Sequence, residues 1–509
     1  MITFLIGLIV LFGGGALYGG LCQKVFMPDN RKTPAYELRD DVDYVPMKKW
    51  KNSLVNLLNI AGTGPILGPI QGILFGPIAF ITIPIGCVIG GAVHDYFNGM
   101  ICTREGGIQM PEMIRRFQNK GVFVVFTMFI CLTLFLCGVV FIYTPADILA
   151  TQVFDADGQT EQVLTWILYG VIFIYYLIAT VLPIDKIIGK IYPIFGAVLI
   201  VSAVGIFVML LISGGPLVEI WDSWSLGGFD FGEYFKTQHF IPVFFVTVAC
   251  GIMSGFHSSQ TALVSRTLEH ERDGRMTFYN MMILEGFIAM IWAAGTMAVI
   301  GYGAKDAGIT MQFSDGAWGF FRESHGVLLQ ISPASVVGIV CKKMLGSIGG
   351  IIALAGVIIL PISSGDTALR SLRLTIAETF HLKQKSSAQR MRVAIPLFAL
   401  VLIILIWAKG DPNGFNSIWR YFGWANQTVT IFATSSITIY LMSHDKMKYA
   451  WIPMIPLAFY SFITTTYLLS APIGPRLDYN ISLIIAGIFT SAVLIATNRR
   501  GNLMRKGII

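Results

Sequence analysis

A run of polar residues interrupts an apolar segment near the middle of this 509-residue chain. Residues 251–260 carry two glycines, three serines, a histidine and a glutamine where the flanking positions are apolar. His257 can carry a proton near neutral pH, because an unperturbed imidazole titrates there, or it can make a fixed hydrogen bond between helices. The candidate substrate-binding residues of this run are Ser254, Gly255, His257, Ser258 and Gln260.

A second interruption lies at residues 59–69, where two prolines and three glycines fall within eleven residues. Proline and glycine at this density cannot hold a regular helix. Backbone amides at the start of a half-helix favour an anion, and glycine lets a ligand approach the backbone closely. We therefore predict that Gly62, Thr63 and Gly64 contact the substrate. The alternative is that these glycines only permit close packing of helices.

A third cluster places hydroxyls and an acid beside a proline and a glycine at residues 360–370. Such groups inside an apolar segment can coordinate a cation or relay a proton. Asp366 has an alternative role, which is an ion pair with Arg370 or Arg373 at the inner end of the segment. The coupling candidates in this cluster are Ser363, Ser364, Asp366 and Thr367.

Four further polar residues lie in or near apolar segments. Asp95 is a candidate for coupling to a cation or proton, and its alternative role is an ion pair with a nearby arginine, Arg104 or Arg115. Asn426 and Gln427 can donate hydrogen bonds to a substrate or cap their own helix. Glu285 is expected to be an interior partner for an ion or a hydrogen bond.

The elements that must position these residues are membrane helices. Hydrophobic residues make up 55% of the chain and charged residues 13%, whereas a soluble domain carries about 25% charged residues. Apolar segments long enough to cross the hydrocarbon core, which takes about 20 residues, number about 13. They run approximately over residues 2–22, 54–75, 77–97, 121–143, 162–182, 189–212, 240–262, 279–302, 344–368, 392–408, 422–442, 449–470 and 479–497.

The loop charges predict the orientation of these segments. Lys and Arg gather in short loops that thirteen crossings would place on one side, and loop 144–161 on the other side has neither. Because positive loops stay in the cytoplasm, we expect the N-terminus outside and the C-terminus inside. The first segment lacks a basic leader and a clear cleavage site, so we expect a retained helix.

The two interruptions lie five segments apart. Because five is odd, the units that they open would cross the membrane in opposite directions, as inverted repeats with discontinuous helices do. Residues 303–343 are expected to form an amphipathic hairpin or re-entrant cap. The predicted regions are an N-terminal helix and cytoplasmic loop (1–53), two five-helix repeats (54–212 and 240–442) and two C-terminal helices with a basic tail (443–509).

Other functional classes fit the sequence less well. The seven cysteines form no CxxC pair, so we expect free thiols and no metal site. We also expect no catalytic site. The chain has no arginine-rich arm of the kind that binds nucleic acid, so we expect no nucleic-acid partner. An ion channel would favour rings of like residues in a symmetric oligomer, a membrane enzyme needs a nucleophile with base and acid partners, and a nutrient sensor that does not transport would usually carry a soluble signalling domain.

Several motifs together resemble the carbon starvation A (CstA) family. The resemblance covers roughly residues 50–440, and the chain looks like a shorter member without the C-terminal extension of the long forms. His94 stands where the family pattern has glutamine. The matching stretches are Gly62-Thr63-Gly64-Pro65 with Gly68-Pro69, Gly90–Tyr96, Ser254–Gln260, Pro361–Arg370 and Trp419–Gln427.

The resemblance implies an inner-membrane transporter with an all-α, LeuT-like core built as a 5+5 inverted repeat. It implies import of peptides during carbon starvation by alternating access coupled to a proton or sodium ion, with pyruvate symport as the alternative. No other cofactor is implied, and the expected partners are the substrate and membrane lipid. In such a core the cation lies between the first and eighth core helices, which adds Ala61 to the coupling candidates.

Overall fold

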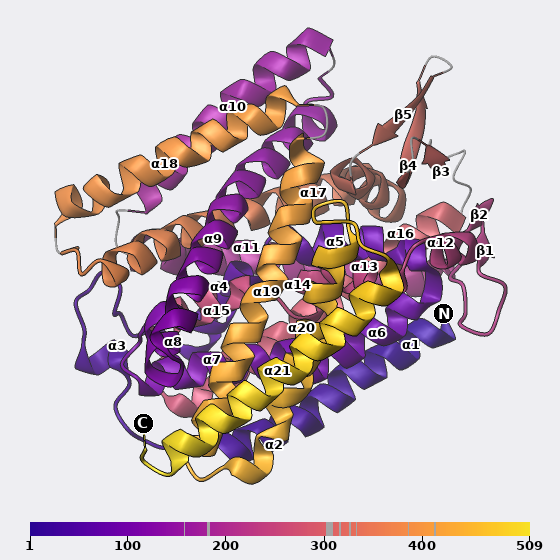
Figure 1. Cartoon of the computed structure of the whole chain (residues 1–509). Coiled ribbons are helices and arrows are strands. Elements are labelled where there is room, and N and C mark those ends of the chain that lie inside the picture. Colours follow the sequence, from indigo (N-terminus) through magenta and orange to yellow (C-terminus); the bar gives the residue numbers. More distant parts are fainter. Residues whose placement is uncertain are drawn as a thin grey trace.

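The computed structural model describes residues 1–156, 158–180, 184–301, 309–314, 317–324, 327–331, 333–384, 386–411 and 414–508. The chain is mostly helical (Figure 1). Among the described residues, ten helices are long and apolar enough to cross a membrane, which confirms a multi-pass membrane protein. Each apolar segment predicted from the sequence contains helix.

The helices of the first part of the chain belong to the predicted N-terminal region and first repeat. Short π-helical turns join α1 to α2 and α6 to α7, over Val10–Gly14 and Cys87–Gly91. The helices are α1 (Ile2–Ile9), α2 (Gly15–Phe26), α3 (Pro34–Glu37), α4 (Lys49–Ala61), α5 (Gly64–Gly72), α6 (Ala79–Gly86), α7 (Ala92–Arg104), α8 (Met110–Phe117), α9 (Lys120–Ile148), α10 (Gly158–Ala179) and α11 (Ile184–Ser213).

The helices of the second part include the longest one, α17, which leaves helical geometry at Gly346, where φ is +68°. Glycine suits this position because a side chain would strain the left-handed backbone. The helices are α12 (Phe231–Thr237), α13 (Phe240–Thr247), α14 (Ala249–Ile252), α15 (Phe256–Val264), α16 (Met281–Gly301), α17 (Pro333–Thr379), α18 (Ser387–Gly410), α19 (Gly414–Ser443), α20 (Trp451–Ser470) and α21 (Tyr479–Arg505).

Local sequence explains where several helices begin. Asn119 accepts a hydrogen bond from Val122 N at the start of α9, and Asp478 does the same for α21. Ser386 and Gln389 form a reciprocal capping box at the start of α18. Side-chain oxygens at these positions satisfy backbone N–H groups that the helix itself leaves without a partner.

Both predicted interruptions are present as breaks in helices. The segment predicted at 54–75 is divided into α4 and α5 at residues 62–63. The segment predicted at 240–262 is divided into α13, α14 and α15, with residues 253–255 between α14 and α15 and an extended backbone at Met253. We call these the first break and the second break.

The all-α prediction is wrong for two small regions. Strands β1 (Ser225–Leu226) and β2 (Phe229–Asp230) form a hairpin, and β3 (Thr310–Ser314), β4 (Ala317–Ser324) and β5 (Val327–Ile331) form an antiparallel sheet. This sheet occupies much of the region predicted as a hairpin or cap, whose Gly316 and Ser332 lie outside the described residues. Its aromatic-rich β4 favours strand geometry.

The helices surround a buried centre. α16 is almost wholly buried, whereas most residues of the apolar stretches of α10, α18 and α21 are at least partly exposed. α10 and α18 lie side by side at one edge of the molecule (Figure 1). In the same view, α3, α8 and the C-terminus lie at the opposite end from β3–β5. The two breaks pack next to α16, in the interior.

Candidate functional site

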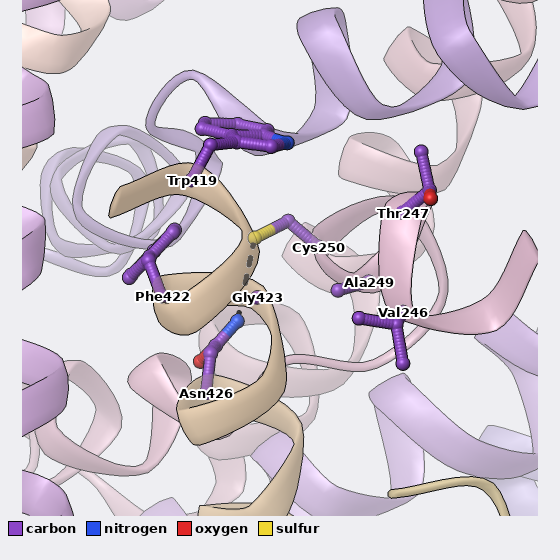
Figure 2. Close-up of a pocket in the computed structure, with 9 residues that line it drawn as sticks. Val246, Thr247, Ala249, Cys250, Trp419, Phe422, Gly423 and Asn426 are labelled. Atoms are coloured by element: carbon purple, nitrogen blue, oxygen red, sulfur yellow. Dashed lines mark hydrogen bonds between the residues drawn. The ribbon is translucent and has the colours of Figure 1, made fainter. Parts of the chain in front are cut away.

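The helices next to the two breaks, α5 and α14, meet at Gly64 and Cys250. A Cβ added to Gly64 would lie 2.2 Å from the Cβ of Cys250, so only glycine allows this close approach. A small pocket opens beside the contact, and Figure 2 shows the side chains of α19 facing those of α13 and α14 across it. The pocket is lined by Gly64, Val246, Thr247, Ala249, Cys250, Trp419, Phe422, Gly423 and Asn426.

The second break is closed by side chains from α19. Asn426 Oδ1 accepts a hydrogen bond from Phe256 N at 2.6 Å and from Ser254 Oγ at 3.2 Å. Asn426 Nδ2 faces Cys250 Sγ at 3.8 Å (Figure 2). Gln427 Nε2 donates to the carbonyl oxygen of Met253 at 2.8 Å. The two amides therefore cap the second break at residues 253–256 and not their own helix.

The first break is bridged by Ser364 of α17. Its hydroxyl donates to Leu58 O at 2.7 Å and accepts from Gly62 N at 3.1 Å. The other two predicted hydroxyls turn back into their own helix, since Ser363 Oγ donates to Leu360 O and Thr367 Oγ1 to Ser364 O. The structure thus brings Ser364 beside Ala61 and Gly62, and directs the other two hydroxyls elsewhere.

Three polar side-chain atoms at the first break have no hydrogen-bond partner in the described structure. They are both amide atoms of Asn59 and the hydroxyl oxygen of Thr63, although Asn59 is fully buried and Thr63 only 2% exposed. Asn59 was not among the residues predicted from the sequence. The asparagines at 52, 56 and 59 could have indicated it, because their spacing places them on one face of α4.

A chain of four ionisable side chains is fully buried next to the breaks. His257 Nδ1 lies 3.0 Å from Asp95 Oδ2, and His257 Nε2 lies 3.5 Å from Glu285 Oε2. His94 Nδ1 lies 2.8 Å from the other oxygen of Asp95. We call these four residues the histidine–carboxylate chain. Glu285 is fully buried, as expected of an interior residue, and its role as an ion or hydrogen-bond partner stays a prediction.

The alternative ion pair of Asp95 with an arginine is wrong. Arg104 lies 3.0 Å from Glu271, and Arg115 lies 2.6 Å from Glu112. Asp95 instead has a histidine against each of its oxygens. Among the described residues, no group of three or more His, Cys, Asp or Glu side chains could hold a metal ion.

The remaining predicted residues also lie in the buried interior. Ser258 Oγ donates to Gly255 O at 2.6 Å, and Gln260 Nε2 donates to Ser259 Oγ at 2.8 Å. Gly255 packs against α19, where an added Cβ would lie 2.1 Å from Asn426 O. Asp366 is fully buried on α17. Residues predicted from distant parts of the sequence are thus gathered around the two breaks.

Comparison with known families gives one match along most of the chain. The model of the family described as "Carbon starvation protein CstA" matches residues 1–154, 138–315 and 327–467. An uncharacterized membrane protein of Haemophilus influenzae is 39% identical over 331 residues, which cover 57% of this chain and 89% of that protein.

More distant relatives have names that state a function. The peptide transporter CstA of Escherichia coli is 23% identical over 86% of this chain and 76% of its own length. The peptide transporter CstA of Mycobacterium tuberculosis is 23% identical over 89% of this chain and 73% of its own length.

Solved structures with a similar fold are LeuT-like secondary transporters. A Na⁺-coupled sialic acid symporter in a substrate-bound outward-open state aligns with a TM-score of 0.55 and 17% identity, over 98% of this chain and 97% of its own. MhsT in complex with L-phenylalanine aligns with a TM-score of 0.54 and 12% identity, over 89% of this chain and 99% of its own. At these identities the similarity establishes the fold alone.

Proposed function

The chain belongs to the carbon starvation protein CstA family, and we propose that it imports small peptides across the cytoplasmic membrane in symport with protons. The relatives named peptide transporters supply the substrate class. The ion-coupled structural neighbours support a secondary transport mechanism. The positive loops support an outside N-terminus and a cytoplasmic C-terminus.

The observation that carries this proposal is the presence of buried polar groups without hydrogen-bond partners at the first break. A buried polar group without a partner costs about 1–3 kcal/mol, and Asn59 and Thr63 together present three such atoms. A peptide offers both donors and acceptors that would satisfy them. Glycines at 62 and 64 leave room for close approach to the backbone, where half-helix amides favour the peptide carboxylate.

The proposed proton site is the histidine–carboxylate chain. His257 lies between two carboxylates that are themselves fully buried. Two adjacent carboxylates cannot both remain charged in an apolar interior without a compensating proton. A proton on the imidazole lets both ring nitrogens donate, one to Asp95 and the other to Glu285. Loss of that proton breaks one contact and makes the net charge of Asp95, His257 and Glu285 one unit more negative, which gives the site two distinct states.

Proton coupling is chosen over sodium coupling because the histidine–carboxylate chain supplies titratable groups beside the breaks. A sodium site between α4 and α17 would draw on the oxygens of Ser363, Ser364 and Thr367. All three hydroxyls donate to backbone carbonyls, and Ser364 also accepts from Gly62 N at the first break. In the proposed cycle Ser364 keeps α17 joined to α4 while substrate and proton load from outside.

Uptake into proteoliposomes tests the proposal. The purified full-length protein is reconstituted, and accumulation of labelled dialanine and of labelled pyruvate is measured under an imposed proton gradient or sodium gradient. We expect dialanine accumulation that requires the proton gradient and disappears with a protonophore. Accumulation of neither compound under either gradient would refute the proposal. Pyruvate accumulation without dialanine accumulation would overturn the peptide assignment.

The proton site has its own variant test. His257→Gln should abolish accumulation driven by the proton gradient and flatten the pH profile of exchange, because glutamine cannot carry the proton. His444→Gln is the matched control, since this histidine is exposed at the end of α19. A His257→Gln variant with the wild-type pH profile would remove the histidine from the coupling mechanism.

A further inference from the structure

Four buried arginines gather beside the loop that joins α3 to α4. Arg266, Arg370, Arg373 and Arg390 are 4%, 1%, 1% and 7% exposed. They come from the segment after α15, from α17 and from α18. We call them the arginine cluster. Arginine is almost never fully buried without a partner, so these buried charges require compensating groups.

Two carboxylates contact the arginine cluster in the described structure. Arg370 Nη1 lies 3.5 Å from Asp43 Oδ1, and Arg266 Nη2 lies 2.8 Å from Glu378 Oε1. Glu378 is on the surface, with 38% of its side chain exposed. Asp43 is a carboxylate buried among these groups. The cluster also donates to the backbone carbonyls of Gly107, Ala179 and Gln384.

The charge of Asp43 reflects the guanidinium groups around it. Burial opposes its ionisation, but the guanidinium groups of Arg370, Arg266, Arg373 and Arg390 outweigh burial and hold the pKa of the Asp43 carboxyl below its usual value. The field at this position therefore stabilises a negative oxygen ligand. Any oxyanion small enough to reach the cluster would be stabilised by the same four groups.

Arg373 has an unused hydrogen-bonding edge. Its Nη1 donates to the side-chain oxygen of Gln384. Its Nε and Nη2 have no partner in the described structure. These two nitrogens form the side-on edge of a guanidinium, whose parallel N–H groups match the two oxygens of a carboxylate or phosphate. The free edge belongs to a side chain that is 99% buried, so water does not satisfy it at the surface.

We propose that the arginine cluster is a binding site for an oxyanion, a carboxylate or a phosphate, which binds the free edge of Arg373 in competition with Asp43. The ligand is a soluble anion or the headgroup of an anionic lipid, and the two sources share this chemistry. The site is separate from the first break, because Arg370 and Arg373 follow Ser364 by six and nine residues on α17. These spacings correspond to about 9 and 14 Å along a helix.

Anion binding here has a mechanical consequence. An anion that draws Arg370 away from Asp43 releases the α3–α4 loop from α17. Because α17 also holds the first break through Ser364, the anion would loosen one end of a helix whose middle contacts the proposed substrate site. Anion binding at the arginine cluster does not depend on which substrate the protein transports, so it can be tested independently of peptide transport.

Thermal unfolding with anion titration tests the proposal. The full-length protein is placed in nanodiscs of phosphatidylcholine, and its Tm is followed as sodium phosphate or sodium acetate replaces sodium chloride at constant ionic strength. A ligand that binds the folded state raises Tm in proportion to its occupancy. We expect saturable stabilisation of the wild type. The half-maximal concentration should fall about tenfold in Asp43→Asn and rise about tenfold in Arg373→Gln.

Arg392→Gln is the matched control, because Arg392 is exposed two residues after Arg390 on α18; its half-maximal concentration should equal that of the wild type. A wild-type value in Arg373→Gln would overturn the proposal, and so would an equal response in every variant. If Arg373→Gln does not fold, Arg373→Lys, which keeps the charge but lacks the two-pronged edge, must bind more weakly than the wild type.

A second set of nanodiscs distinguishes the two sources. If phosphatidylglycerol raises the Tm of the wild type but not of the Arg373→Gln variant, and removes the response to phosphate, the ligand is the lipid headgroup. A phosphate response that is the same with and without phosphatidylglycerol identifies a soluble anion. An intact anion response in a protein that transports no dialanine would refute the proposed function and leave this site in place.

Discussion

The first and second breaks use the same kind of backbone interruption, but their polar groups are satisfied differently. At the second break, Asn426 and Gln427 reach in from α19 and take up backbone and hydroxyl groups of residues 253–256. At the first break, Ser364 satisfies two backbone groups, while Asn59 and Thr63 keep three unpaired polar atoms. Burial of such atoms is unfavourable unless a ligand completes them.

This difference assigns different roles to two regions that look alike in the sequence. The second break is a joint held by the amides of Asn426 and Gln427, although Gln427 Oε1 itself has no partner in the described structure. We propose that the first break, with three such atoms, is where a ligand supplies the missing partners. Experiments can separate the two roles, because removing a cap of the joint lowers stability, whereas replacing an unpaired group of the incomplete site lowers transport and leaves stability nearly unchanged.

The largest expected effect is at Gly255 of the second break. A Cβ at this position would lie 2.1 Å from Asn426 O and 2.6 Å from the Cβ of Val429. Relief requires α19 to move, and overpacking of this kind costs about 3 kcal/mol. Gly255→Ala should therefore lower the Tm and the yield of folded protein in nanodiscs. Gly170→Ala, with no atom within 4 Å of the added Cβ, is the control and should be neutral.

A related pair of variants tests the contact between the breaks. Gly64→Ala should destabilise the protein, because the added Cβ meets Cys250. The double variant Gly64→Ala with Cys250→Gly moves the methylene group to the other side of the contact and should recover much of the stability. Equal Tm values for the single and double variants would show that the two breaks do not pack as described.

The second prediction removes the cap of the second break. Asn426→Ala leaves the amide of Phe256 and the hydroxyl of Ser254 without their acceptor, and each lost bond to a buried group costs about 1–3 kcal/mol. We expect a loss of about 2 kcal/mol, seen as a lower denaturation midpoint. Asn426→Asp keeps the acceptor oxygen and should lose less. An unchanged midpoint in Asn426→Ala would contradict the role of the second break as a joint.

The third prediction makes the matching change at the first break. Asn59→Leu replaces an amide that has no partner with an apolar side chain of similar volume, which is neutral or stabilising by up to about 1 kcal/mol. Uptake of dialanine should fall about tenfold, the effect of losing about 1.4 kcal/mol of ligand binding. If stability falls as far as it does in Asn426→Ala, the two breaks play the same structural role.

The positions of both breaks could be predicted from the sequence, because glycine and proline act locally. The chemistry between the breaks depends on long-range contacts, and sequence indicated it only in part. Asp95 and His257 are 162 residues apart, and the partners that the sequence suggested for Asp95 were nearby arginines. Asn59 was overlooked because a polar residue in an apolar segment gives no sign of whether a partner faces it. Strand β4 was missed since its region was interpreted as part of a membrane cap.

The smallest expected effect distinguishes two neighbouring hydroxyls. Ser364→Ala removes the bridge between α17 and the first break and should cost about 1 kcal/mol, whereas Thr367→Val removes the bond that this hydroxyl donates within α17 and should cost about 0.5 kcal/mol or less. Proton-driven uptake should also weaken in Ser364→Ala alone, because α4 and α17 lose the contact that holds them together during loading. Denaturation midpoints and initial uptake rates of the two variants, measured side by side, check this. Identical behaviour of the two variants would mean that the first break is held by its backbone and not by Ser364. The first break would then differ from the second in having no side-chain cap that contributes to stability.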